Sequence, residues 1–234
     1  MKRIITFCLF IACSTINAQS IVFKDPKLKK TLIKLGLDKN NNSQIELSEI
    51  EDIKELDISG KKIKYLDDLK HFKNLKVLNA NTNKISDINV FNGNQIIEII
   101  YIGDNKLGPQ LTLENIPNLK GFYAFRNQIK ELKFISPFPN LISLYIQGNP
   151  FNELNVQNLI NLKNLQLFEC DDLKKVTLNK KTKIEQFFIL DMKIKKIISL
   201  SEDTNTIYLE KKENAYNEQY NENFKIAPTF RTKN

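Results

Sequence analysis

The residues that could carry covalent catalysis are few in this 234-residue chain. His71 is the only histidine, and the three cysteines form no C-x-x-C pair. We find no Ser/His/Asp set, no zinc-type spacing of histidines and no glycine-rich loop for a phosphate. Acidic pairs such as Asp67–Asp68 are typical of solvated turns. We therefore expect a protein that is not an enzyme.

Oxygen-bearing side chains are concentrated in residues 38–49, DKNNNSQIELSE. The segment resembles an EF-hand calcium loop, with Ile45 at its apolar eighth position. The resemblance implies five ligand positions, the fourth of them acting through its backbone carbonyl: Asp38, Asn40, Asn42, Gln44 and Glu49.

Two departures from the EF-hand pattern weaken the predicted calcium site. Ser43 replaces the usual glycine, and two of the ligands are neutral asparagines. We expect either no cofactor or a weakly bound structural calcium ion, with a Kd on the order of 10⁻⁴–10⁻³ M. The alternative is a polar turn that joins a cap helix to a short second helix at Leu47–Ile50.

An eleven-residue template, L-x-x-L-x-L-x-x-N-x-L, recurs seven times at intervals of 21 or 22 residues. Apolar residues at positions 4 and 6 alternate with period two, which predicts a short strand in each unit. Asparagine at position 9 suits the turn that follows, because its amide both donates and accepts hydrogen bonds. A degraded eighth copy is predicted around Ile207 and Leu209. The seven copies begin at Ile53, Leu75, Ile97, Leu119, Leu141, Leu162 and Ile184.

This pattern resembles the leucine-rich repeat family, in particular its bacterial internalin-like subgroup with 22-residue repeats. The resemblance implies an α/β solenoid, a horseshoe with a parallel concave sheet and a short 3₁₀ or irregular convex side. It also implies a role in protein recognition or adhesion. Because one unit cannot bury its apolar side alone, the copies should stack around one continuous core.

Aromatic residues occupy the strand face that points away from this core. At position 5 of successive units, Tyr101, Tyr123 and Tyr145 should form a column, because neighbouring strands lie about 4.8 Å apart. We predict a ligand-binding face made of these tyrosines and five further residues: Phe125, Phe168, Phe188, Arg126 and Asp104.

The aromatic residues allow three interpretations, which differ in the kind of ligand that the face binds. A protein partner is our leading hypothesis, because tyrosine combines a rigid apolar ring with a polar tip. A glycan is the second, with sugars stacked on the tyrosines and Asp104, Arg126 and Gln147 supplying hydrogen bonds. The third is a structural envelope protein without a dedicated ligand, whose rings only stabilise the sheet.

The two ends of the chain differ from the repeats. Residues 1–18 have the charged, apolar and small-residue sections of a secretory signal peptide, which predicts export to the cell surface, the periplasm or the medium. A rival interpretation makes Cys13 the lipid-carrying residue of a lipoprotein. We assign residues 19–52 to a helical N-terminal cap, 53–209 to the repeats and 210–234 to a polar tail or cap. The net charge of +8 fits a solvated lysine surface rather than nucleic-acid binding, and no later segment is apolar enough to span a membrane.

Overall fold

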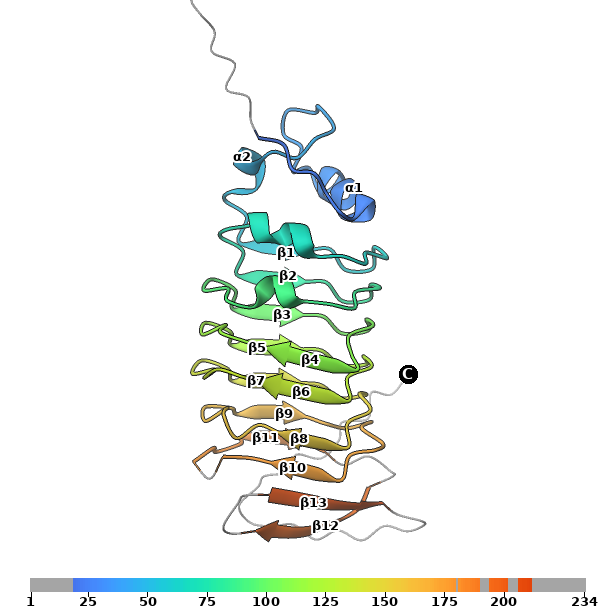
Figure 1. Cartoon of the computed structure of the whole chain (residues 1–234), viewed down its shortest axis with the longest axis vertical. Helices are drawn as coiled ribbons and strands as arrows, with labels where there is room; N and C mark the ends of the chain where they lie inside the picture. Colours follow the sequence, from blue (N-terminus) through green and yellow to red (C-terminus); the bar gives the residue numbers. More distant parts are fainter. Residues whose placement is uncertain (1–18, 180, 190–193, 202–205, 212–234) are drawn as a thin grey trace, which may run out of the picture.

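The computed structural model describes residues 19–179, 181–189, 194–201 and 206–211. Its main feature is a stack of short parallel strands, one from each repeat unit, in a single sheet (Figure 1). Each strand pairs with the equivalent residues of the next unit, as Leu78 does with Ile100. The predicted leucine-rich repeat solenoid is thereby confirmed. In spatial order the strands are β1 (Glu55–Asp57), β2 (Val77–Asn79), β3 (Ile99–Tyr101), β5 (Gly121–Tyr123), β7 (Ser143–Tyr145), β9 (Asn164–Gln166) and β11 (Gln186–Phe188).

The opposite side of the solenoid changes character along the stack. The first two units carry the expected 3₁₀ helices, η1 (Asp67–His71) and η2 (Asn89–Phe91). Later units have short parallel strands there, because their return segments alternate apolar and polar residues, as in QLTL and ELKF. These strands are β4 (Gln110–Leu113) paired with β6 (Glu131–Phe134), and β8 (Glu153–Asn155) paired with β10 (Lys175–Thr177).

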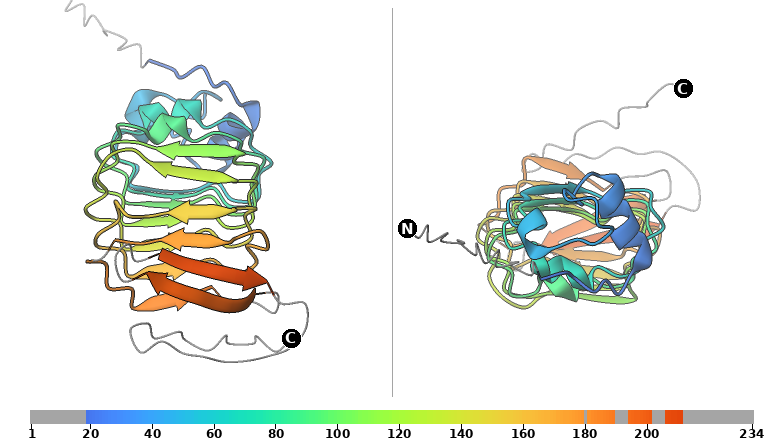
Figure 2. Two further views of the ribbon diagram at one scale, coloured as in Figure 1. Left: turned by 60° about the horizontal axis from the view of Figure 1, so that its bottom comes forward. Right: turned by 90° about the horizontal axis from the view of Figure 1, so that it is seen from above.

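A hairpin lies at the C-terminal end of the stack (Figures 1 and 2). Its strands are β12 (Ile194–Ser201) and β13 (Thr206–Lys211), and β13 pairs antiparallel with β10. The segment expected as a degraded eighth copy therefore joins the second-side sheet instead of extending the main sheet. The predicted signal peptide, which includes Cys13, and residues 212–234 of the predicted tail lie outside the described residues.

One core runs the length of the stack, and the chain coils around it when viewed from above (Figure 2). Template positions 4 and 6 supply its main-sheet side, as with Leu144 and Ile146, which are fully buried. Position 8 has a left-handed backbone conformation in each of the first six units, at Gly60, Thr82, Asp104, Arg126, Gly148 and Glu169. This turn directs the side chain at position 9 back under the strand.

The asparagines at position 9 form a buried ladder of hydrogen bonds, which we call the asparagine ladder. The amide nitrogen of Asn127 donates to the carbonyl oxygens of Ala124 (3.2 Å) and Phe125 (3.1 Å) in its own unit, and to Ile102 (3.0 Å) in the preceding one. Its amide oxygen accepts from the backbone N–H of Leu107 at 2.9 Å. The other members bond in the same way and are Asn83, Asn105 and Asn149. Each amide thus joins two neighbouring units.

Replacing Asn127 by Ala should destabilise the fold by about 2–4 kcal/mol, because several buried backbone groups lose their partners. Denaturant unfolding monitored by circular dichroism measures the change. Asn118→Ala is the matched control. Asn118 is exposed and donates one hydrogen bond, to Gln95 O at 2.6 Å, so its loss should cost less than about 1 kcal/mol. Equal effects of the two variants would contradict the assigned role of the ladder.

The N-terminal cap lies over the first unit of the stack (Figure 1). Its helices are α1 (Pro26–Lys34) and α2 (Leu47–Ile50). The buried carboxylate of Asp25 caps α1 by accepting from Lys27 N at 2.8 Å. Its second oxygen accepts from the backbone N–H groups of Lys64 (2.6 Å) and Tyr65 (3.2 Å) in the first repeat. One carboxylate therefore both starts the helix and fastens it to the repeats.

The same carboxylate should make stability depend on pH. Burial raises the pKa of Asp25, but the backbone hydrogen bonds outweigh burial and the net pKa lies below its ordinary value. The unfolded chain, with a carboxyl pKa of about 3.9, then takes up protons first as the pH falls. The stabilisation is therefore present above about pH 4 and is lost below it.

We expect the Tm of the wild type to fall more steeply between about pH 5 and pH 3 than that of Asp25→Asn. The asparagine retains an acceptor for the cap but cannot titrate in this range. Asp25→Ala should lose about 1–2 kcal/mol at neutral pH. Thermal unfolding across the pH series checks both expectations, and parallel Tm profiles for the wild type and Asp25→Asn would contradict the first.

Candidate binding face

Three tyrosines of the main sheet contact one another, as their spacing predicted. The rings of Tyr101 and Tyr123 are stacked with centroids 4.5 Å apart and planes 18° apart. The rings of Tyr123 and Tyr145 meet edge to face at 4.9 Å and 83°. All three rings are half-buried. The column is therefore a packed array in which each ring restricts its neighbour.

Two glycines leave space for the rings of Tyr123 and Phe125, a feature that the repeat template did not reveal. A Cβ atom on Gly121 would lie 2.6 Å from Cε2 of Tyr123, and one on Gly103 would overlap the ring of Phe125. The rings therefore lie close against the sheet at these two points. Burial raises the pKa of Tyr123, an effect that the flanking tyrosines increase and a hydrogen bond with Ser143 opposes.

The remaining aromatic residues extend the face toward the C-terminal end. Phe125 and Phe168 occupy position 7 of their units, and Gln147 occupies the same position in the unit between them. Phe188 is on β11. The side chains of these four residues are all half-buried. The side-chain oxygen of Gln147 is buried and accepts no hydrogen bond within the described residues. We define the aromatic face as the tyrosine column with these four residues: Tyr101, Tyr123, Tyr145, Phe125, Gln147, Phe168 and Phe188.

The two charged residues predicted for the site lie at the border of the aromatic face. Arg126 extends past Gly148, and its Nε is 3.4 Å from the carboxylate of Glu169, two units away. Both side chains are about half exposed, so this pair contributes little to stability. Asp104 is half-buried in the equivalent turn.

The face becomes polar at its N-terminal end. The amide of Asn79 donates to the carboxylate of Asp57 at 3.1 Å, and Asp57 accepts from Ser59 N at 2.9 Å. Hydrogen bonds from Ser59 lower the pKa of Asp57, so this carboxylate is charged at neutral pH. The main sheet thus presents a polar surface over β1 and β2 and an aromatic surface from β3 onward.

The predicted calcium loop folds into a turn held by its own side chains. Asp38 accepts from the backbone N–H groups of Asn42 (3.1 Å) and Ser43 (2.9 Å). The side-chain amides of Asn40 and Asn42 donate to Glu46, at 3.2 and 2.8 Å. Within the described segments, no three acidic, histidine or cysteine side chains are arranged to hold a metal ion.

The predicted last ligand, Glu49, is engaged within the same loop. It accepts from the backbone N–H groups of Lys39 (2.7 Å) and Glu46 (2.9 Å). Burial raises the pKa of Glu49, but these hydrogen bonds reduce it further and the net pKa lies below its ordinary value. Gln44 accepts from Lys29 through its side-chain oxygen at 2.9 Å. In this conformation the side-chain oxygens of four predicted ligands accept hydrogen bonds from backbone N–H groups of the loop: Asp38, Asn40, Asn42 and Glu49. Calcium binding stays a prediction.

Isothermal titration with CaCl₂ tests the calcium prediction. The EF-hand resemblance predicts a weak binding isotherm, with a Kd on the order of 10⁻⁴–10⁻³ M, and a higher Tm in calcium, because the ion binds only the folded state. Both effects should disappear in Asp38→Ala. Neither heat nor a change in Tm for the wild type would mean that the loop is a metal-free turn.

Comparison with known proteins gives only distant similarities. No protein-family model matches the chain, and no curated protein does. One similar solved structure is internalin C2 of Listeria monocytogenes, with 17% identity, a TM-score of 0.38 and coverage of 69% of this chain and 100% of that one. Another is the internalin InlF of the same organism, with 15% identity, a TM-score of 0.35 and coverage of 75% and 86%. No helix among the described residues is long and apolar enough to cross a membrane. At this level of identity, function has to be inferred from the chain's own residues.

Proposed function

We propose that this chain is an exported, non-enzymatic binding protein that recognises another protein through the aromatic face. The observation that carries the proposal is the contact array of Tyr101, Tyr123 and Tyr145, packed over Gly121. Rings held in this way lose little conformational entropy when a partner covers them. Large aromatic residues also dominate the energetic centres of protein interfaces.

The composition of the aromatic face supports binding over a purely structural role. Sheet stability is served by the buried framework at positions 4 and 6, which already fills the core. Each aromatic ring on the outer face offers about 150–250 Å². Six of them, half-buried on one face of the main sheet, supply apolar area on the scale that usually marks an interaction site.

Ring geometry favours a protein partner over a glycan. A sugar ring stacks on the open face of an aromatic side chain. Tyr101 and Tyr123 instead turn ring faces toward each other, and Tyr145 meets Tyr123 at 83°. This arrangement offers no flat platform of parallel rings, and its mixed ring orientations suit the irregular side chains of a protein surface. Half-buried Ile99, beside Tyr101 on β3, adds apolar area at its border.

The double variant Tyr101→Ser/Tyr145→Ser tests the proposal while leaving the central ring in place. We expect it to remain folded and to bind the partner at least about 30-fold more weakly, the effect of losing about 2 kcal/mol at an energetic centre. Affinity capture from extracellular and cell-surface fractions identifies the partner. Surface plasmon resonance with the purified partner then measures affinity, and a glycan array is run with the same proteins.

Ile135→Ser is the matched control, because Ile135 is 59% exposed and follows β6 on the opposite side of the solenoid. It should bind as the wild type does. Partner binding unaffected by the double variant would refute a site on the aromatic face. Glycan binding that is lost in the double variant, without any protein partner, would establish the alternative ligand class.

A further inference from the structure

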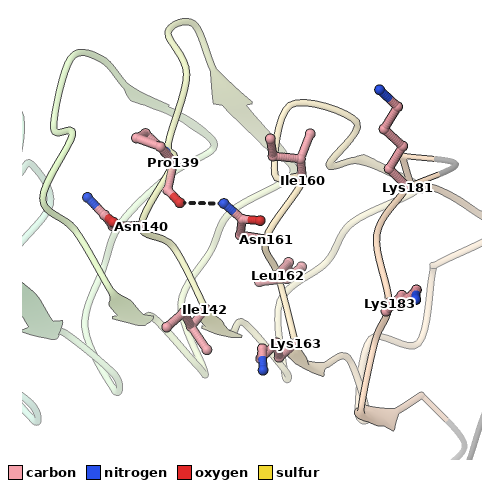
Figure 3. A pocket seen from close by; sticks show the side chains of 9 residues that line it. All are labelled: Pro139, Asn140, Ile142, Ile160, Asn161, Leu162, Lys163, Lys181 and Lys183. Atoms are coloured by element: carbon pink, nitrogen blue, oxygen red, sulfur yellow. Dashed lines mark hydrogen bonds between the residues drawn. The ribbon is translucent and has the colours of Figure 1, made fainter.

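A second surface, distinct from the aromatic face, lies along the edge of the main sheet where strands β7, β9 and β11 begin. Three successive return segments form an open depression there, with a volume of about 440 Å³ (Figure 3). Its framework is tied together by the amide of Asn161, which donates to the carbonyl oxygen of Pro139 at 2.7 Å. The lining residues are Pro139, Asn140, Ile142, Ile160, Asn161, Leu162, Lys163, Lys181 and Lys183.

The depression has an apolar part that the repeat does not require. Ile142 and Ile160 are 39% and 47% exposed, so they contribute little to the core. At the position of Ile142, neighbouring units carry charged residues; Glu98, for example, pairs with Lys120 at 2.6 Å. Ile142 therefore interrupts a charged stripe beside the strands, and Ile160, on the neighbouring return segment, adds a second exposed isoleucine to the lining of the depression (Figure 3).

Lysines line the depression on the side of the segments that precede β9 and β11, and no carboxylate is among the lining residues (Figure 3). Lys163 pairs with Glu185 at 2.8 Å. Lys181 and Lys183 form no ion pair with any residue that the structure describes. Lys183 also occupies the unit position at which Asn140 and Asn161 supply structural hydrogen bonds. The depression therefore combines two exposed isoleucines with two lysines, Lys181 and Lys183, that no carboxylate of the described residues pairs with.

We propose that this depression, the lysine–isoleucine depression, docks an acidic segment of a partner protein that carries a carboxylate next to a bulky apolar side chain. The apolar side chain covers Ile142 and Ile160, and the carboxylate pairs with Lys181 and Lys183. Charge complementarity selects an acidic ligand. A peptide is favoured over an anionic membrane because the apolar patch consists of two side chains in a hollow, too little area to insert into lipid.

Fluorescence polarisation with short synthetic peptides tests the proposal. The acidic probe carries two glutamates flanking a leucine and a phenylalanine; a second probe has lysines in place of the glutamates, and a third has serines in place of the apolar pair. Only the first should bind at low salt, and binding should weaken as salt is added. Lys181→Ala/Lys183→Ala and Ile142→Ser/Ile160→Ser should each weaken binding by about fivefold or more.

Lys106→Ala/Lys130→Ala is the charge-matched control, because both lysines are exposed and neither lines the depression. This variant should bind as the wild type does. The reversal Lys181→Glu/Lys183→Glu should transfer preference to the basic probe, a result that a loss of folding cannot produce. Equal binding of the acidic and basic probes by the wild type, or an equal loss in the control variant, would overturn the proposal. So would variant-sensitive binding to phosphatidylglycerol vesicles without binding of the acidic peptide, which would point to a membrane.

Discussion

The buried amide at position 9 is the interaction on which the rest of the structure depends. A side-chain amide can donate two hydrogen bonds and accept two, and Asn83, Asn105, Asn127 and Asn149 use this capacity to join two turns of the chain at once. The left-handed residue before each of them aims the amide inward. Because this joint repeats at fixed spacing, equivalent strand residues meet their counterparts in every pair, and side chains at one template position gather into a column.

The columns explain why much of the fold and part of the candidate site could be predicted from the sequence. Periodicity identifies the strands, the core positions, the turn asparagines and the neighbouring tyrosines, since all of these follow from one repeated backbone path. The helical cap was predictable from Asp25 and Pro26, which carry ordinary start signals. The contact of Asp25 with Lys64 could not be predicted, because the two residues are far apart in the sequence and no local pattern connects them.

Other features depend on side-chain packing, which spacing alone does not determine. The template treats Gly103 and Gly121 as variable positions, yet their missing Cβ atoms decide how closely the rings of Phe125 and Tyr123 approach the sheet. Ring orientation depends on rotamers, so a column of tyrosines could be located but its mixture of stacked and edge contacts could not. Strands β4, β6, β8 and β10 on the second side arise from weaker alternation in segments of variable length, for which the resemblance implied only 3₁₀ or irregular structure.

Cys170 occupies the ladder position in the sixth unit, and its thiol lies 3.7 Å from the carbonyl oxygen of Ile146. A thiol is a weak donor and a weak acceptor, and it lacks the second donor of an amide. The joint at this point therefore couples neighbouring units less strongly than the four joints before it. In a quasi-one-dimensional array, cooperativity is carried from unit to unit across such joints. The solenoid is therefore expected to open first from the hairpin end as far as Asn149, and the tyrosine column lies in the segment expected to exchange its amide protons last.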